Sequence, residues 1–165
     1  SSIAALMHDD HFGIIAEDLT IIDKHLKLHN PSNLIKLSSE VSDIMNNKLK
    51  KYSEYEDIRG RNFYEIYPKK HNDEPSLNRC YFLNWSEKNK NISISKMENL
   101  DVFKNLLTFS YGTLDEMNLC VDFSYKMHMI NKIMKNSEFY FVTRPKNIDD
   151  IDNSVSRLKE HIINF

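Results

Sequence analysis

The chain of 165 residues carries 22 basic and 24 acidic side chains, and its formal net charge of -2 gives no surface that would attract a polyanion. Its longest apolar runs hold about five residues, whereas a membrane-spanning helix needs roughly 20. These totals argue against a transmembrane helix and against nucleic-acid binding by this chain. We expect one cytoplasmic domain over 1–165, of which 1–10 are disordered or include residues that precede a natural start at Met7.

The first third of the chain is predicted to be helical. Apolar residues recur every three or four positions over 11–28 and again over 34–52, which predicts a helix in each segment. Asn30-Pro31-Ser32 lies between them as a break and a fresh N-cap, because proline is tolerated in the first turn of a helix.

Later runs have the aromatic and β-branched content of strands. These runs are 62–67, 79–85, 92–94, 118–123 and 138–143. A helix is predicted over 97–109, while 127–134 suits either a strand or a short helix. The inward face of the helix over 97–109 is expected to carry Leu100, Phe103, Leu106 and Leu107.

The run Glu138–Pro145 is the stretch around which we expect the fold to be organised. Three aromatic residues and a valine in succession leave no face for water, so this run should be a central strand covered on both sides. A C-terminal helix should follow and lie on its sheet. The apolar stripe of that helix is Ile148, Ile151, Val155, Leu158 and Ile162.

The order of these elements predicts the fold class. Several strands are joined by polar loops of about ten residues, which are too short for a parallel crossover. We therefore expect an α/β chain of the α+β type, with one mainly antiparallel sheet of four to six strands and helices packed on its faces.

Two groups of histidines have spacings that metal ligands use. His8-Asp9-Asp10-His11 gathers four potential ligands near the N-terminus, and His25 and His29 would share one face of a helix. The pair lacks an acidic third ligand, and the group of four lies at a chain end. Solvent-facing histidines are the favoured interpretation, and neither a metal nor another cofactor is expected.

No pattern indicates a catalytic residue. The acidic run Glu54, Glu56 and Asp57 is interpreted as an exposed loop, and no Gly-x-Ser-x-Gly elbow occurs. Cys80 and Cys120 lack the Cys-x-x-Cys spacing of zinc or redox sites and are interpreted as reduced core cysteines.

The aromatic residues are more numerous than a thin single-sheet core requires. A pocket for a small apolar ligand between sheet and helices is one use for them, and plain core packing is the other. The residues expected to line such a pocket are Tyr64, Phe82, Trp85, Phe103, Tyr111, Phe139 and Phe141.

The segment 38–44 followed by the strand 63–68 resembles the N-terminal part of the sensor domains of LuxR-type transcriptional regulators. The ending, 138–141 and an isoleucine-rich amphipathic helix to Phe165, resembles the close of such a domain. The likeness covers about residues 38–165 and consists of apolar patterns. It implies a PAS- or GAF-like sandwich that binds a small signal molecule, often dimerises and usually controls a C-terminal helix-turn-helix.

Two departures from that family limit what is carried over. The Trp-x-x-x-Tyr and Asp-Pro features of acyl-homoserine-lactone receptors are absent, so no binding residue is assigned from the resemblance. The sequence also ends at Phe165 without a DNA-binding half, which is expected either to have been removed or never to have been present.

Three functions are compatible with these observations. The first is a ligand-sensing regulatory domain of a bacterial transcriptional regulator. The second is a non-enzymatic protein-binding module, such as a bacterial effector or an immunity protein, whose mark would be a contiguous apolar or charged patch on the outside. The third is an enzyme with dispersed catalytic residues.

Overall fold

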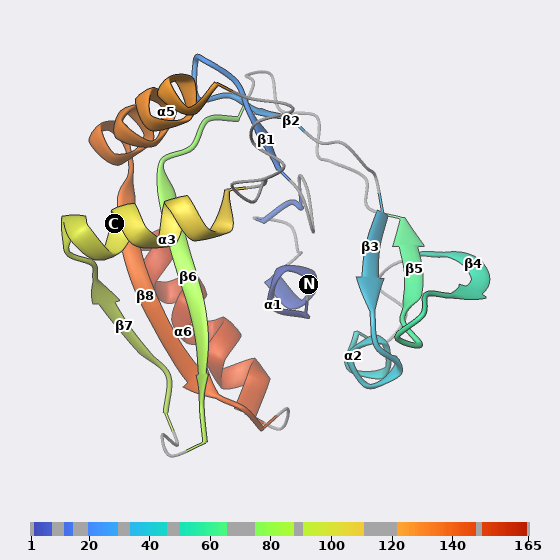
Figure 1. The fold of residues 1–165 in the computed structure, drawn as a ribbon. Coiled ribbons are helices and arrows are strands. Elements are labelled where there is room, and N and C mark those ends of the chain that lie inside the picture. Colours follow the sequence, from blue (N-terminus) through green and yellow to red (C-terminus); the bar gives the residue numbers. More distant parts are fainter. Residues whose placement is uncertain are drawn as a thin grey trace. The chain divides into compact units, whose positions relative to one another are not determined.

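The computed structural model describes residues 2–7, 12–14, 20–29, 34–45, 50–65, 75–87, 91–110, 122–147 and 150–164 (Figure 1). These residues form helices and mostly antiparallel strands, which confirms the predicted α+β class. The chain divides into two compact units: unit 1 comprises 1–75 and 151–165, and unit 2 comprises 76–150. The single domain over 1–165 stays a prediction. Nowhere in the described part of the chain is a helix both long enough and apolar enough to cross a lipid bilayer.

Unit 1 contains three helices and five strands within the described residues. They are α1 (Ser2–Met7), β1 (Ile21–Ile22), β2 (Leu28–His29), β3 (Leu34–Leu37), α2 (Ser39–Ile44), β4 (Lys50–Glu56), β5 (Asn62–Glu65) and α6 (Ile151–Ile163). Strands β1 and β2 form an antiparallel pair, and β5 lies between β3 and β4 in an antiparallel sheet of three strands. Helices α1 and α6, from opposite ends of the sequence, are in contact.

Helix α2 is joined to one face of the three-stranded sheet of unit 1. Ile35 pairs with Tyr64 and Leu37 pairs with Asn62, and all four residues are buried. Since paired residues share a face of a sheet, these side chains form one inner surface. The hydroxyl groups of Ser42, on α2, and Tyr64 are hydrogen-bonded, which ties the helix to this surface.

The helix predicted over 11–28 is wrong for the described residues 21–28. Residues 21–22 and 28–29 are the strands β1 and β2 instead. The carboxylate of Asp23 accepts the backbone N–H groups of His25 and Lys27 at 2.8 and 2.9 Å and so closes a turn. Leu26 has a φ of 62°, in the left-handed region, which is incompatible with a continuous right-handed helix.

Among the described residues of 34–52, the predicted helix is correct only where α2 lies. Its first residues form β3, in which the odd positions Ile35 and Leu37 are buried. This is the period of two of a strand, which over so few residues resembles a helical pattern of apolar residues. Ser38, with an extended backbone, starts α2, and the chain is extended again in β4. Pairing with β5 supplies backbone hydrogen bonds that a helix would otherwise have made.

Within its described residues, unit 2 is a three-stranded sheet with two helices. Its elements are β6 (Arg79–Ser86), β7 (Ser93–Lys96), α3 (Asn99–Phe109), α5 (Phe123–Asn136) and β8 (Glu138–Pro145). Strand β8 lies between β6, with which it is parallel, and β7, with which it is antiparallel. Its neighbours Phe139 and Tyr140, which point to opposite faces, are both buried. The predicted central strand covered on both sides is therefore confirmed.

The expectation of one sheet of four to six strands is wrong. The described strands form separate sheets of two, three and three strands. The mainly antiparallel pairing is confirmed, since four of the five described pairings are antiparallel. The exception is β6 with β8, and the chain between these strands contains β7, α3 and α5, which is long enough for a crossover.

The remaining elements refine the expectations for the helices. Residues 127–134, which suited either a strand or a helix, belong to the helix α5. Phe123, the last residue of the strand predicted over 118–123, is the first residue of α5 instead. The carboxylate of Asp122 accepts the backbone N–H of Ser124 and caps this helix. Residues 111–121 lie outside the described part of the chain.

Helix α3 is confirmed, but its buried residue is Val102, whereas Leu100 is exposed. The C-terminal helix is confirmed as α6, with Ile151, Val155 and Leu158 buried. Its packing on the sheet of β8 stays a prediction.

Candidate ligand-binding site

The sheet of unit 2 has one uncharged face and one charged face. Side chains alternate along a strand and paired residues share a face, so the register assigns each residue to one side. What we call the phenylalanine face carries Cys80, Phe82, Asn84, Ser86, Ser93, Ser95, Phe139, Phe141, Thr143 and Pro145. The charged face carries Arg79, Tyr81, Leu83, Trp85, Ile94, Lys96, Glu138, Tyr140, Val142 and Arg144.

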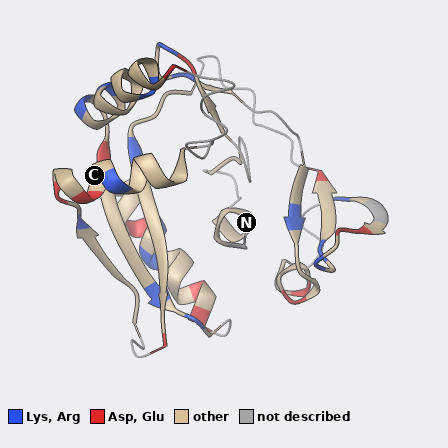
Figure 2. Ribbon diagram, viewed as in Figure 1, with Lys and Arg blue, Asp and Glu red and all other residues tan. Residues whose placement is uncertain are grey.

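Every charged residue of these three described strands lies on the charged face. They are Arg79, Lys96, Glu138 and Arg144. Figure 2 shows the lysine and arginine positions of the ribbon in blue and the aspartate and glutamate positions in red. The phenylalanine face therefore offers rings, a thiol, hydroxyl groups and an amide, but no ionised strand residue.

Three phenylalanine rings form a stack at the junction of sheet and helix. The Phe82 ring lies 5.8 Å from that of Phe109 and 6.5 Å from that of Phe139, with angles of 29° and 18° between the ring planes. Phe109 belongs to α3, so α3 lies over the phenylalanine face, as Figure 1 shows where it crosses in front of β6 and β8. The exposed fraction rises along the stack, from 5% at Phe139 to 72% at Phe109.

The groups of the charged face are paired with one another. Glu138 accepts hydrogen bonds from Arg79 Nε at 3.0 Å and from the Tyr140 hydroxyl at 3.3 Å, and Lys96 Nζ lies 3.7 Å from its other oxygen. The hydrogen bond from Arg79 is the main cause of a lowered pKa of Glu138, and the same bond raises the pKa of Arg79. This arrangement keeps both groups ionised and joins the starts of β6 and β8, which is a structural role.

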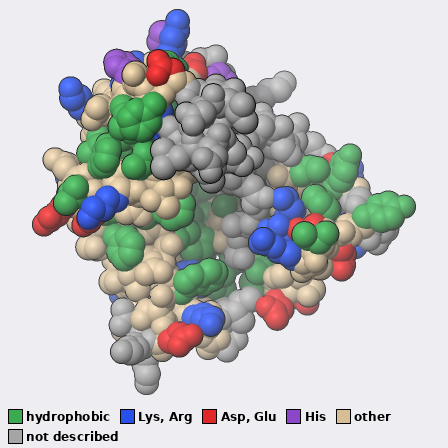
Figure 3. Space-filling model, in the orientation of Figure 1, with side chains coloured by type: hydrophobic (Ala, Val, Ile, Leu, Met, Phe, Trp, Pro, Cys, Tyr) green, Lys and Arg blue, Asp and Glu red, His purple; other side chains and the backbone are tan. Residues whose placement is uncertain are grey.

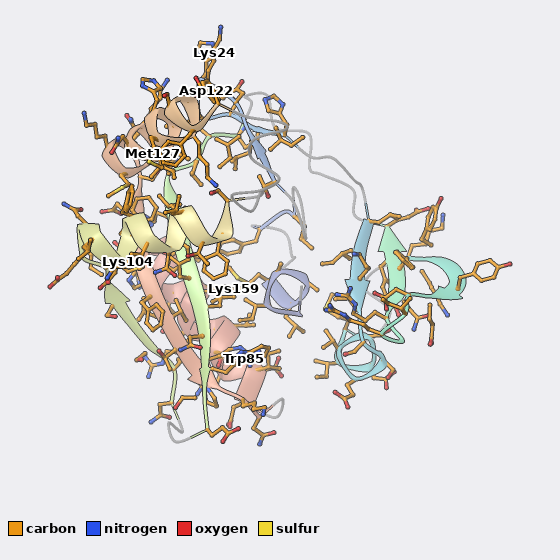
Figure 4. All side chains as sticks on the ribbon, viewed as in Figure 1. Lys24, Trp85, Lys104, Asp122, Met127 and Lys159 are labelled. Carbon is orange, nitrogen blue, oxygen red and sulfur yellow. The ribbon has the colours of Figure 1, made fainter. Side chains whose placement is uncertain are left out.

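Trp85 lies on the charged face, away from the phenylalanine stack. The Arg144 guanidinium carbon is 4.8 Å from the centroid of the indole ring, a cation–π contact at the far end of β6 and β8. Figure 4 labels Trp85 on β6. The predicted lining residues Phe82 and Trp85 thus point to opposite sides of one strand.

The other predicted lining residues are dispersed. Phe139 and Phe141 share the phenylalanine face with Phe82, and Phe103 is half-buried on α3. Tyr64 lies in unit 1, where it is bonded to Ser42, and Tyr111 lies outside the described residues.

Sequence reasoning missed Phe109. It follows Val102 and Leu106 at positions i+7 and i+3, and this spacing could have placed it on the same stripe of the helix.

Cys80 lies on the phenylalanine face as a free, half-buried thiol. Burial raises its pKa from 9.0 to about 11. At neutral pH the sulfur is therefore protonated, which is unsuited to a nucleophile or a metal ligand.

The histidine pair is not arranged as a metal site. His25 lies in the turn after β1, and His29 lies on β2 with its Nε2 atom 3.3 Å from Asp23 Oδ2. The residues 8–11 lie outside the described part of the chain. Among the described residues, no three histidine, cysteine, aspartate or glutamate side chains gather closely enough to hold a metal ion.

A second surface feature is the turn between β4 and β5, at residues 57–60. Oδ1 of Asp57 accepts the backbone N–H groups of Arg59 and Arg61 at 2.9 and 3.0 Å, and its Oδ2 lies 2.9 and 2.8 Å from Nε and Nη2 of Arg61. Gly60 has a φ of 69°, as the turn requires. The acidic run predicted to be an exposed loop thus lies in β4 and in this ordered turn.

This turn presents apolar side chains to water. Ile58, on the turn, is fully exposed, and Tyr55, on β4, is 83% exposed. Figure 3 shows hydrophobic side chains, in green, projecting where Figure 1 labels β4. We call Tyr52, Tyr55 and Ile58 the turn surface.

A scan of protein-family models gives no match to this chain, and neither a search of curated proteins nor a search of solved structures gives one. The resemblance to LuxR-type sensor domains therefore stays a prediction.

Proposed function

We propose that the chain is a ligand-sensing regulatory domain of a bacterial transcriptional regulator, acting in the cytoplasm, and that its small molecule binds between α3 and the phenylalanine face. The observation that supports this proposal is the gradient of burial along the stack. Phe109 keeps 72% of its surface exposed while its ring stacks on Phe82, whereas Phe139, which stacks on the other side of Phe82, is only 5% exposed. An aromatic ring held in place at the surface offers a preformed apolar contact.

The position of the stack links binding to conformation. A ligand that touches both Phe82 on β6 and Phe109 on α3 favours the arrangement in which the helix lies on the sheet. Helix α3 also contacts α5, so a change in the position of α3 alters a second element. Differential affinity for two such arrangements is what a sensor needs to bias an output, such as dimerisation or a fused helix-turn-helix.

A thermal-shift screen of small apolar molecules tests this proposal, with native mass spectrometry of each hit to establish binding. Phe109→Ala removes the exposed end of the stack, and Trp85→Ala is the matched control because it removes a largely exposed ring from the opposite face. We expect a hit whose stabilising effect is lost in Phe109→Ala and kept in Trp85→Ala. A screen without hits, or hits indifferent to Phe109, would contradict the proposal.

The turn surface favours a second function, that of a non-enzymatic protein-binding module such as an effector or an immunity protein. The Asp57 carboxylate fixes the turn through four contacts, so Ile58 is presented with little loss of conformational entropy on binding. Tyrosine is enriched in binding hot spots, and the exposed Tyr55 lies on β4 shortly before this turn.

Affinity capture from cells, repeated with Ile58→Asp, tests the second function. The matched control is Ile163→Asp, which introduces the same charge at an exposed isoleucine on α6. A defined partner that is lost with Ile58→Asp and kept with Ile163→Asp would support the module. A partner kept by both variants would contradict this use of the turn surface.

A further inference from the structure

We propose that the molecule taken up by the phenylalanine face is a neutral, flat aromatic compound with a hydroxyl or amide substituent. This inference rests on the proposed function, because it assigns the chemical class of ligand to the same site. Three observations carry it: the charge pattern of the sheet, the orientation of the rings and the polar residues around them.

The charge pattern selects against an ionised ligand. All four charged residues of the described strands β6, β7 and β8 lie on the opposite face. On α3, Asp101 and Lys104 are exposed and lie 4.0 Å apart, so each has the other as its counter-ion. A carboxylate or an ammonium group placed against the phenylalanine stack would lose water without gaining a strand counter-charge.

The orientation of the rings selects a flat molecule over a flexible chain. The ring planes of Phe109 and Phe82 differ by 29° and those of Phe82 and Phe139 by 18°, so each neighbouring pair is stacked rather than edge to face. The stack is open at the Phe109 end, where most of the ring is exposed. A planar aromatic ligand that lies between α3 and the phenylalanine face, in contact with Phe82 and Phe109, can stack on these rings with favourable offset geometry, while a saturated chain gains only the burial of its surface and must be ordered.

The surroundings of the rings supply neutral polar groups. Ser93 and Ser95 on β7, Asn84 on β6 and Thr143 on β8 share the phenylalanine face. Hydroxyl and amide side chains can both donate and accept hydrogen bonds, and they carry no charge. Asn84 lies two positions from Phe82 on the same face of β6, so we expect a hydroxyl or amide of a ligand that contacts Phe82 to pair with this side chain.

Isothermal titration calorimetry at neutral pH with three compounds of one ring skeleton tests the class. The compounds are 2-naphthol, which is neutral and flat, 2-naphthoate, which is flat but anionic, and decahydro-2-naphthol, which is neutral but saturated. We expect 2-naphthol to bind with a Kd about tenfold or more below that of either other compound, since stacking alone contributes about a factor of ten. Equal binding of 2-naphthoate would overturn the charge argument, and equal binding of decahydro-2-naphthol would overturn the stacking argument.

Variants locate the binding and separate this inference from the proposed function. Phe82→Leu and Phe109→Leu should each weaken 2-naphthol binding about tenfold, and Trp85→Leu on the charged face should leave it unchanged. Phe109 is mostly exposed, so its variant is expected to fold even if Phe82→Leu does not. If a screening hit of another class binds in a Phe109-dependent way while 2-naphthol does not, the ligand class is wrong and the sensor proposal stands. If neither 2-naphthol nor any screening hit binds, both fall.

Discussion

Arg61 and Asp57 are joined both through side chains and through the backbone. Nη2 of Arg61 lies 2.8 Å from Oδ2 of Asp57, and the backbone N–H of Arg61 donates to Oδ1 at 3.0 Å. One carboxylate therefore closes the turn between β4 and β5, and its charge state is coupled to the order of that turn.

This coupling predicts a dependence of stability on pH. The pKa of Asp57 is lowered from 3.8 to about 2, chiefly by the hydrogen bond from the Arg61 backbone. A carboxyl group with a lower pKa in the folded state contributes stability that is present above its unfolded pKa and is lost as the pH falls through the folded pKa. We expect Asp57→Asn to lower the Tm at neutral pH, and the difference from the wild type to shrink as the pH falls from 3.8 to 2.

Thermal melts followed by circular dichroism across that pH range give the measurement. Asp43→Asn, which removes an exposed carboxylate on α2, is the control and should change the Tm much less at neutral pH. A pH-independent difference for Asp57→Asn would show that the carboxylate charge is not what holds the turn.

Gly60 should tolerate alanine poorly because of its backbone. Its φ of 69° lies in the left-handed region, where a residue with a Cβ atom loses about 1–2 kcal/mol. An added Cβ would meet Glu56 Oε2 at 3.6 Å, an ordinary contact, so the loss comes from the dihedral angle and not from crowding. Urea unfolding of Gly60→Ala should show this loss, and Gly60→Asn a smaller one, since asparagine adopts this region more readily. Equal losses would contradict the backbone explanation.

The two ends of the phenylalanine stack should differ in their contribution to stability. Phe139 is buried on the central strand, so Phe139→Ala should lower the free energy of unfolding by about 3–5 kcal/mol. Phe109 is mostly exposed, so Phe109→Ala should lower it by less than about 1 kcal/mol. Chemical denaturation of the two variants measures both values. A large loss for Phe109→Ala would make this ring part of the core and would remove the support for a ligand site.

Cys80 should be slow to react and should make the folded state sensitive to alkaline pH. Its pKa is raised from 9.0 to about 11 by burial, so the thiolate that attacks iodoacetamide is scarce in the folded protein. A raised folded-state pKa contributes stability that is present below pH 9.0 and is lost as the pH rises toward 11. Peptide mass spectrometry after alkylation should show Cys80 modified far faster in urea than in the native state. Equal rates would mean that the thiol is accessible.

The sequence alone predicts unit 2 better than unit 1. The apolar run of β8 indicates a strand buried on both faces, and the structure places it at the centre of its sheet. The helices over 11–28 and 34–52 were predicted from apolar spacing, which contains no information about the φ of Leu26 or about the Asp23 carboxylate that turns the chain. Division into three sheets is set by pairing between distant segments, which local periodicity does not encode.

Only part of the candidate site could be predicted, because local sequence pattern does not encode contacts between distant segments. Phe139 and Phe141 are two positions apart and necessarily share a face of a strand. Their alignment with Phe82 depends on the parallel register of β6 and β8, and the contribution of Phe109 depends on where α3 lies, so neither could be read from local pattern.

The place of β8 between β6 and β7 also has a consequence for synthesis of the chain. The two outer strands, β6 and β7, leave the ribosome before α3, α5 and finally β8. Until β8 is synthesised, they have no strand between them with which to pair. A product that terminates before Glu138 should be degraded rather than persist as a smaller functional version. To test this, the chain is divided between Asn136 and Glu138, and each fragment is fused to one half of a split reporter. The reporter should give a signal only when the second fragment supplies β8 to the sheet.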